Sequence, residues 1–315
     1  MEKNDETHIT FENVLVIVIG ILSVLANSCL ILVMIKDPLK EFRTKISYLV
    51  ICLAVADLLT AINGILYGIL FSMNMYDISL WYLIWTSVLV SVFTVFGMCV
   101  ERWFAILYPF KSNSVRSKKL TLYFCIGVWI ICGGMASSIH FLPLVSPFVL
   151  SSTLEMFLFV IVFLYLNMLH GIKQNLKTSN AVGDVPSSQK EAKTNLSKRY
   201  KMAIEAQLVK VVSILVLIMF LTFIPYNLAI QINYGYLLFR GTSPSSVTLF
   251  ARYFFPVKFL NFLLNPFVYA WRLKKYRKSF SLVFCRWKRK KVIQVISSGE
   301  NNFTVRGFDG MYSSR

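Results

Sequence analysis

Seven long blocks of apolar residues constrain what this chain can fold into more than any other feature. They cover roughly residues 11–35, 46–71, 78–107, 120–141, 150–173, 203–232 and 247–271. A helix needs about 20 apolar residues to cross the hydrocarbon core of a bilayer, where the backbone must satisfy its own hydrogen bonds. Barrel strands would instead alternate polar and apolar residues over shorter stretches. We therefore predict an all-α membrane protein, a seven-transmembrane helix bundle.

The segments between and after the blocks predict how the rest of the chain is organised. Loops are short except for residues 177–201, which are rich in Ser, Asn and Lys, and there we expect a solvated loop. After the last block, apolar residues recur at helical spacing between cations, which predicts a short cytoplasmic amphipathic helix. We expect an extracellular N-terminus, a transmembrane domain, an amphipathic membrane-surface helix and a disordered cytoplasmic tail at residues 1–12, 13–272, 273–287 and 288–315.

The distribution of charge predicts the orientation of the blocks. Of 33 Lys and Arg residues, only Lys3, Arg240 and Arg252, the last at the outer end of the seventh block, are assigned outside, and Lys258 falls deeper within that block. Because cytoplasmic loops carry an excess of basic residues, we expect the N-terminus outside and the C-terminus in the cytosol. Anionic lipids of the inner leaflet account for the net charge of +18, so we expect membrane lipids and no nucleic acid as partners.

Cysteine and histidine positions predict neither a disulfide nor a metal cluster. Five of the six cysteines lie inside blocks and the sixth, Cys285, lies near the C-terminal end, so none is placed outside for a structural disulfide. Cys285 is a candidate for palmitoylation, with an unmodified thiol as the alternative. No nucleophile, base and metal ligands occur together, so we do not expect an enzyme.

Polar residues inside the blocks form a set with a known order. The first two blocks carry Asn27 and Asp57, the third ends in Glu101-Arg102-Trp103, and the last contains Asn265-Pro266-Phe267-Val268-Tyr269. Polar groups at membrane depth are costly and tend to be functional. From about residue 27 to 285 the chain resembles the rhodopsin-like family of G-protein-coupled receptors. The resemblance implies a plasma-membrane receptor that binds an extracellular ligand and activates heterotrimeric G proteins.

The resemblance also implies a switch in the middle of the bundle. Its polar cluster would hold a sodium ion, the one bound group that we expect, through Asp57 and its neighbours Asn27, Ser91, Asn261 and Asn265. A neutral Asp57 that only joins helices is the alternative. Pro225 and Pro266 would distort the sixth and seventh spans. In the active state Tyr269 would meet Tyr165 through water, although Tyr165 could simply anchor the interface.

The cytosolic end would carry the contacts with the G protein. By resemblance, Arg102 pairs with Glu101 and with Glu205 of the sixth span, and this latch opens when that span moves outward. A static salt bridge between helices is the alternative. Trp103 stands where the family usually has Tyr, and Phe110 in the second cytoplasmic loop would pack on the G protein.

The outer end departs from the usual family pattern. The family's extracellular Cys of the third span is absent near Asp77, the second outside loop is short, and the fifth span has no proline. These losses resemble the melanocortin, lysophospholipid, cannabinoid and adenosine-like branch, whose ligands differ widely. Ile84 replaces the Asp that biogenic amines require. The resemblance places the ligand among aromatic and apolar residues that could alternatively serve helix packing alone, namely Asn63, Tyr67, Ile84, Ser87, Val88, Glu155, Phe223, Tyr226, Asn227, Phe255 and Lys258.

Lys258 is a cation inside the seventh span. The retinal lysine of an opsin would lie one residue later, where Phe259 stands, and one residue turns a helix by about 100°. Because Lys258 lies one residue away from that position, an opsin-like photoreceptor is an alternative function and not the main prediction. A transporter is a weaker alternative. We expect Lys258 to pair with Glu155 or with an anionic ligand group, or else to extend its ammonium to the outer interface.

Overall fold

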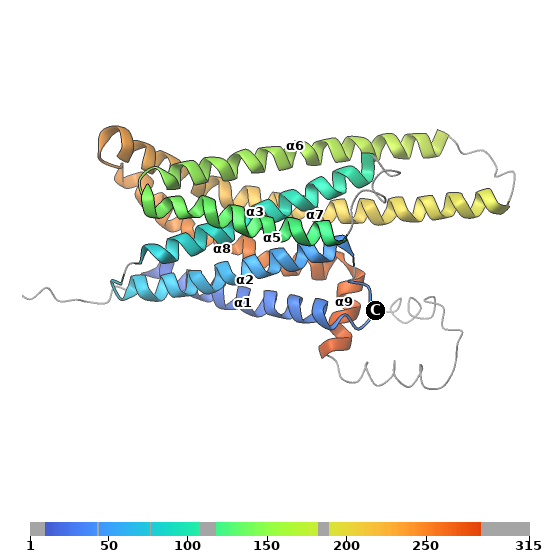
Figure 1. Ribbon diagram of the computed structural model, residues 1–315, viewed down its shortest axis with the longest axis horizontal. Coiled ribbons are helices and arrows are strands. Elements are labelled where there is room, and N and C mark those ends of the chain that lie inside the picture. Colours follow the sequence, from blue (N-terminus) through green and yellow to red (C-terminus); the bar gives the residue numbers. More distant parts are fainter. Residues whose placement is uncertain (1–9, 43, 76, 108–117, 182–188, 285–315) are drawn as a thin grey trace, which may run out of the picture.

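The computed structural model describes residues 10–42, 44–75, 77–107, 118–181 and 189–284, and their side chains apart from those in 175–207. These residues form a bundle of long helices (Figure 1). Their bounds are α1 Phe11–Lys36, α2 Lys45–Ser72, α3 Ile78–Leu107, α5 Lys118–Phe141, α6 Ser146–Ala181, α7 Gln189–Arg240, α8 Ser245–Arg272 and α9 Lys274–Phe284.

Seven of the described helices, α1 to α3 and α5 to α8, are long and apolar enough to cross a membrane. They coincide with the seven blocks predicted from the sequence, so the predicted fold is confirmed. The connections from α2 to α3 and from α7 to α8 lie at one end of the bundle, whereas α9 lies at the other end (Figure 1). The bundle therefore has two distinct ends, which we call the outer end and the inner end in line with the predicted orientation.

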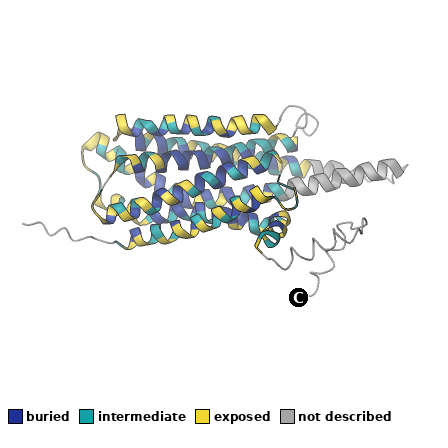
Figure 2. Ribbon diagram, turned by 60° about the horizontal axis from the view of Figure 1, so that its bottom comes forward, coloured by how far each residue is buried: buried dark blue, intermediate teal, exposed yellow. Residues whose placement is uncertain are grey.

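Helix α3 lies at the centre of the bundle, because it contacts α2, α5, α6 and α7. Helix α1 packs on α2 and α8, and α8 packs on α7, which closes the bundle around α3. Buried residues face the inside of the bundle and exposed residues face outward (Figure 2). The outward faces carry large apolar side chains such as Ile130 and Phe163, as a lipid-facing surface requires.

The segment between α6 and α7 differs from the sequence prediction. Residues 177–201 were expected to form a loop, but α6 continues to Ala181 and α7 already begins at Gln189, so most of this segment is helical. Residues 189–201 contain four Lys and one each of Arg, Glu and Gln, which have high helix propensity without being apolar. Both helices extend beyond the inner end of the bundle in Figure 1.

The connection from α5 to α6 is also shorter than predicted. It was expected to cover about residues 142–151, but α6 begins at Ser146 and leaves only residues 142–145 outside helices. Pro147 fits the first turn of α6 because a helix needs no backbone N–H donor there. This short connection leaves the outer end of the bundle with little loop cover on that side.

Helix α9 is attached to the bundle by one buried aromatic ring. Tyr276 is 5% exposed, while its neighbours Lys275 and Arg277 are exposed. Burial raises the pKa of the Tyr276 hydroxyl to about 12. Lys275 also lies 3.5 Å from the carboxylate of Glu41, in the connection after α1. The short helix predicted after the seventh span is present and contacts α1 and α8.

Candidate functional site

Asp57 is completely buried in the middle of α2 and joins three helices. The Ser91 hydroxyl of α3 donates to Asp57 Oδ1 at 3.0 Å, and the Asn265 amide of α8 donates to Oδ2 at 2.6 Å. A buried carboxylate needs such donors, because its desolvation is otherwise too costly. The structure therefore brings together three residues that the family resemblance placed in one polar cluster.

Asn27 connects α1 to α8 beside this cluster, and Asn261 is buried in α8 one helical turn before Asn265. The Asn27 amide donates to the backbone carbonyl of Phe262 at 3.0 Å and to that of Ser23 at 3.0 Å. Within the described chain, the side-chain oxygens of Asn27, Asn261 and Asn265 have no hydrogen-bond partner, although all three residues are buried. Hard cations prefer carboxylate and carbonyl oxygens, and waters also fill buried polar sites. The cluster fits the predicted sodium ion, which stays a prediction.

Arg102 lies at the inner end of α3 with its side chain almost fully buried. Its Nε donates to Glu101 Oε2 at 2.6 Å, and the two side chains form an ion pair. The side chain of Glu205 lies outside the described residues, as do Phe110 and Cys285. Of the predicted latch, the structure thus describes only the half that lies within α3.

A small apolar cluster beside Arg102 joins α3, α6 and α7. Ile106 of α3, Met168 of α6 and Val209 of α7 are buried together, and Trp103 and Tyr165 pack against them. The Tyr269 hydroxyl of α8 instead reaches the sulfur of Met98 at 4.0 Å. The two tyrosines therefore contact different groups here, and their meeting through water remains a prediction for the active state.

A continuous series of aromatic rings runs down from the outer end of the bundle. The ring centroids of Tyr67 and Phe255 lie 5.1 Å apart, and those of Phe255 and Phe259 5.2 Å apart. Phe259 then contacts Phe262 at 5.8 Å, and Phe262 contacts Phe223 at 5.9 Å. Such distances are favourable for aromatic pairs. Because the Phe262 carbonyl bonds to Asn27, the series ends at the polar cluster.

Phe259 and Phe262 were not among the predicted site residues, although the sequence contains the signal. Phe255, Phe259 and Phe262 recur at intervals of four and three residues, which places them on one face of a helix. Pro225 and Pro266 stand inside α7 and α8, close in sequence to Phe223 and Phe262. The aromatic series is thus carried by the two helices that contain prolines at these positions.

Lys258 is buried inside the bundle, with only 2% of its surface exposed. Its Nζ lies 4.4 Å from the ring centroid of Tyr226, 4.8 Å from Phe255, 5.7 Å from Trp85 and 5.9 Å from Phe259. We call these four rings the lysine cage. The prediction that Lys258 extends to the outer interface is therefore wrong, because the side chain turns inward and packs against ring faces.

The predicted ion pair between Lys258 and Glu155 is also absent from the described structure. Glu155 Oε2 instead accepts a hydrogen bond at 2.9 Å from the Gln231 amide of α7, which also reaches Ser152 at 3.2 Å. Glu155 therefore faces the α6–α7 contact. The sequence places both residues in the outer part of the bundle, but only the rotation of each helix decides whether they meet.

The remaining predicted ligand residues are packed in the interior. Asn63, Ile84, Ser87, Val88 and Asn227 are all buried. The Ser87 hydroxyl donates to the carbonyl of Leu83 at 2.9 Å, so it is engaged within its own helix. The Asn227 amide nitrogen has no hydrogen-bond partner within the described ranges.

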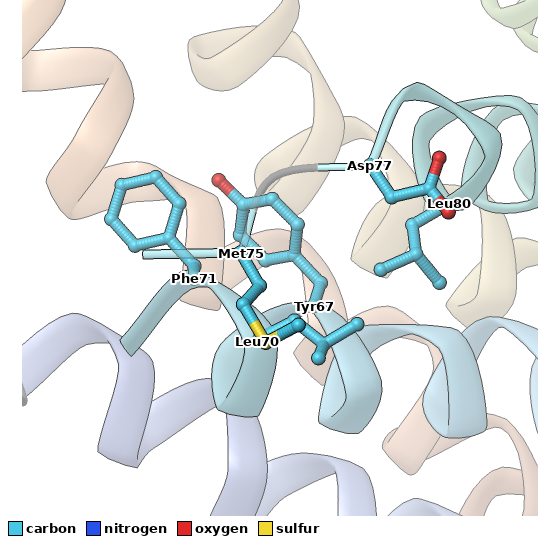
Figure 3. Close-up of a pocket in the computed structure, with 6 residues that line it drawn as sticks. All are labelled: Tyr67, Leu70, Phe71, Met75, Asp77 and Leu80. Atoms are coloured by element: carbon cyan, nitrogen blue, oxygen red, sulfur yellow. The ribbon is translucent and has the colours of Figure 1, made fainter. Parts of the chain in front are cut away.

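A depression at the outer end lies between the end of α2 and the start of α3 (Figure 3). Among the predicted ligand residues only Tyr67 lines it, together with Leu70, Phe71, Met75, Asp77 and Leu80. Asp77 Oδ1 accepts a hydrogen bond from the Ser79 backbone at 2.8 Å, which lowers the pKa of this exposed carboxyl and caps the start of α3. Figure 3 shows Asp77 and Leu80 across the depression from Phe71.

Residues 26–149 match the model of the family described as 7 transmembrane receptor (rhodopsin family). This stretch contains Asn27, Asp57, Ser91 and Arg102, so the cluster and the inner end of α3 both lie within the match. Over this stretch the chain is similar to the rhodopsin family of seven-transmembrane receptors. Its seven candidate spans describe a multi-pass membrane protein, and the relatives that it matches are receptors.

The chain is similar to receptors with unlike names. Mouse lysophosphatidic acid receptor 4 is 24% identical over 62% of this chain and 55% of its own length, and the chain thus spans about half of that relative. The chicken thyrotropin-releasing hormone receptor is 24% identical over 88% of this chain and 79% of its own length. Rat melanopsin is 24% identical over 88% of this chain and 62% of its own length. At such identity the relatives support the resemblance to this family and do not indicate the ligand.

Proposed function

We propose that this chain is a G-protein-coupled receptor, with its N-terminus outside the cell. An extracellular ligand binds at the outer end, and a heterotrimeric G protein binds at the inner end beside Arg102. Binding of the ligand favours a conformation in which α7, the sixth span, moves outward from α3. The ligand shifts a population between two states, so it needs only to bind one state better than the other.

The buried connection between the two ends carries this proposal. The aromatic series runs from Tyr67 to Phe223, and the carbonyl of Phe262 links it to the polar cluster through Asn27. The cluster in turn joins α8 to α2 and α3 through Asp57. A ligand that displaces the ring of Phe255 therefore repacks α7 and α8 together. Packed interiors of this kind switch between discrete arrangements and do not deform continuously.

The polar cluster would stabilise the resting conformation. A bound sodium ion supplies positive charge beside the Asp57 carboxylate, which would offset the cost of burying it. The side-chain oxygens of Asn27, Asn261 and Asn265 are the groups that would complete its coordination or hold waters. Movement of α8 changes the separation of these groups, so the ion would leave when the active state forms.

The inner end would then become accessible to the G protein. In the resting arrangement α7 covers this end through Val209, which is buried with Ile106 and Met168. Outward movement of α7 separates these side chains and uncovers Arg102. The guanidinium, released from Glu101, could then contact the G protein. Glu205 would be a second resting partner in α7, and Phe110 would add an apolar contact.

Two substitutions in α3 test this proposal in cells. Glu101→Gln removes the charge that holds Arg102, and a loss of 1 to 2 kcal/mol from the resting state corresponds to a rise in basal signalling of roughly 5- to 30-fold. Arg102→Ala should reduce signalling to the level of untransfected cells. The readout is dissociation of G-protein subunits across a panel of G-protein classes, at matched surface expression.

Glu41→Gln provides the matched control, because Glu41 pairs with Lys275 at the inner end but not with Arg102. It should leave basal signalling unchanged. Equal signalling by Glu101→Gln and wild type, or undiminished signalling by Arg102→Ala, would count against the proposed role of Arg102.

A retinal-binding photoreceptor is the second candidate, because Lys258 is buried among aromatic rings and one relative is melanopsin. A protonated retinal imine would need a carboxylate nearby. Among the described residues of the outer half, however, Glu155 bonds to Gln231 and Asp77 is exposed. Incubation of the purified chain with 11-cis-retinal should therefore give no visible absorbance band, and a band that Lys258→Met removes would favour this candidate instead.

A further inference from the structure

Lys258 carries an ammonium group in the interior of a membrane-spanning helix, where a charge without a counter-ion is costly. The faces of aromatic rings attract cations, and the lysine cage offsets part of this cost. Rings cannot replace an anion, however, because they supply neither a full negative charge nor hydrogen-bond acceptors. An anion close to the Lys258 ammonium would offset the remaining cost of burying this charge.

The acidic residues of the outer half that the structure describes are engaged elsewhere. Glu12 lies 3.3 Å from Arg252 in an ion pair between α1 and α8. Asp77 caps α3, and Glu155 accepts from Gln231. Within the described ranges, Lys258 forms no ion pair with any of them. None of the described acidic residues of the outer half therefore serves as a counter-ion for Lys258.

The lysine cage lies close to the outer depression. Tyr67 lines that depression, and its ring contacts Phe255, which is a member of the cage. Trp81 packs against both rings, with centroid distances of 5.5 Å to Tyr67 and 6.0 Å to Phe255. These three rings, which we call the three-ring plug, connect the depression in Figure 3 with the lysine cage, because Tyr67 lines the depression and Phe255 contacts the ammonium of Lys258.

We propose that Lys258 anchors an anionic group, a carboxylate or a phosphate, of the receptor's ligand. The ligand enters from the outer depression, its apolar part takes the place of the three-ring plug, and its anion pairs with the ammonium. Displacement of Phe255 then acts on Phe259 and Phe262, which links recognition to the switch. The inference rests on the proposed receptor function for its biological meaning, but binding of an anion can be measured without signalling.

Binding can be tested with four probes that share one alkyl chain, namely dodecanoate, dodecyl phosphate, dodecanol and dodecylamine. The full-length chain is purified in lipid nanodiscs, and its melting temperature is recorded against probe concentration below micelle formation. We expect the two anions to raise the melting temperature by about 3 °C at saturation. Dodecanol and dodecylamine should have no such effect. A stronger response to phosphate or to carboxylate would identify the preferred anion.

The variant Lys258→Met keeps the length and apolar body of the side chain and removes its charge. The half-saturating concentration of the anions should rise at least about tenfold in this variant. Lys275→Met is the matched control, because Lys275 is exposed at the inner end, and it should respond like wild type. If Lys258→Met does not purify, Lys258→Gln takes its place in the same comparison.

The inference is overturned if Lys258→Met responds to the anions like wild type, or if dodecanol stabilises the wild type as much as dodecanoate does. In both cases the probes would bind through the alkyl chain alone. A failure of G-protein activation with intact anion binding would contradict the proposed function and leave the anion site standing. Intact signalling without anion binding would contradict the anion site and leave the proposed function standing.

Discussion

Asp57 illustrates what a sequence can predict about a single residue. Its position in the second span, with Ser91 and Asn265 as neighbours, follows from the family resemblance, and the structure places all three in direct contact. The bond from Asn27 to the Phe262 carbonyl was not predicted, because a backbone acceptor has no sequence signature. The resemblance thus placed Asp57, Ser91 and Asn265 together, but it did not predict the bond that Asn27 forms.

Removal of the Asp57 charge should abolish a stabilising effect of sodium. The wild type should melt about 2 to 4 °C higher in sodium chloride than in N-methylglucamine chloride at equal ionic strength, because an ion that binds only the folded state stabilises it. Asp57→Asn should melt at the same temperature in both salts. Thermal unfolding of the purified chain measures this difference.

Asp77→Asn is the control for this experiment, because Asp77 is exposed and lies outside the cluster. It should keep the sodium dependence of the wild type. An undiminished sodium effect in Asp57→Asn would show that the ion, if bound, lies elsewhere.

Lys258 illustrates the opposite case at the same scale. Its place inside a span could be read from the sequence, but its surroundings could not, because they depend on the rotation of α3, α7 and α8 about their axes. The predicted partner Glu155 faces Gln231 instead, and ring faces lie around the ammonium. Contacts between residues that are distant in the sequence cannot be derived from their spacing alone.

At the scale of the elements, the apolar helices were predicted well and the polar helical segments were not. The bounds of α1, α2, α3, α5 and α8 differ from the predicted blocks by two residues or fewer at each end. The inner parts of α6 and α7 were predicted as loop, because their polar residues carry no hydrophobic signal. Helix propensity decides the structure of such segments, and hydropathy decides only which part of a helix can lie in the membrane.

The contact between α2 and α8 depends on the absence of a side chain at Gly64. A Cβ atom at this position would clash with Cε1 of Phe259 and lie 2.8 Å from its Cζ. The Phe259 ring is itself buried, so it has little room to move. Gly64→Ala should therefore destabilise the bundle by about 1 to 3 kcal/mol. The melting temperature of the purified variant measures this loss.

Gly127 of α5 gives the matched control, since a Cβ atom there meets nothing within 4 Å. Gly127→Ala should melt at or slightly above the wild-type temperature, because Ala favours a helix over Gly by up to about 1 kcal/mol. Adding Phe259→Leu to Gly64→Ala should restore part of the loss. A Gly64→Ala variant as stable as the wild type would show that α2 and α8 do not pack this closely.

At the scale of the whole molecule, the seven-helix bundle followed from hydropathy alone, whereas its function did not. Seven apolar helices could equally build a channel or a transporter. The order of a few polar residues, from Asn27 to Tyr269, narrowed the choice to one receptor family, and the family match supports that choice. The ligand could not be predicted, because the outer residues lack the features that relate a family member to a ligand class.

The two ends of the bundle thus differ in what their residues indicate. The inner end carries Arg102 and its apolar neighbours, which fit the proposed binding of a G protein. The outer end carries the depression, the three-ring plug and Lys258, which together form the proposed anion site. The proposed receptor works only if a change at the outer end alters the position of α7 at the inner end.

The most direct test is to fix α7 against α3 and measure G-protein activation. Ile106→Cys and Val209→Cys, in the Glu101→Gln background, place thiols on two residues of the same buried cluster. A short bifunctional thiol reagent with a reducible linker would join them, with each single cysteine variant as its control. Nucleotide exchange on purified G proteins should fall to the unstimulated rate after cross-linking and recover after reduction. Exchange that is as fast in the cross-linked protein as in the reduced one would contradict the outward movement of α7.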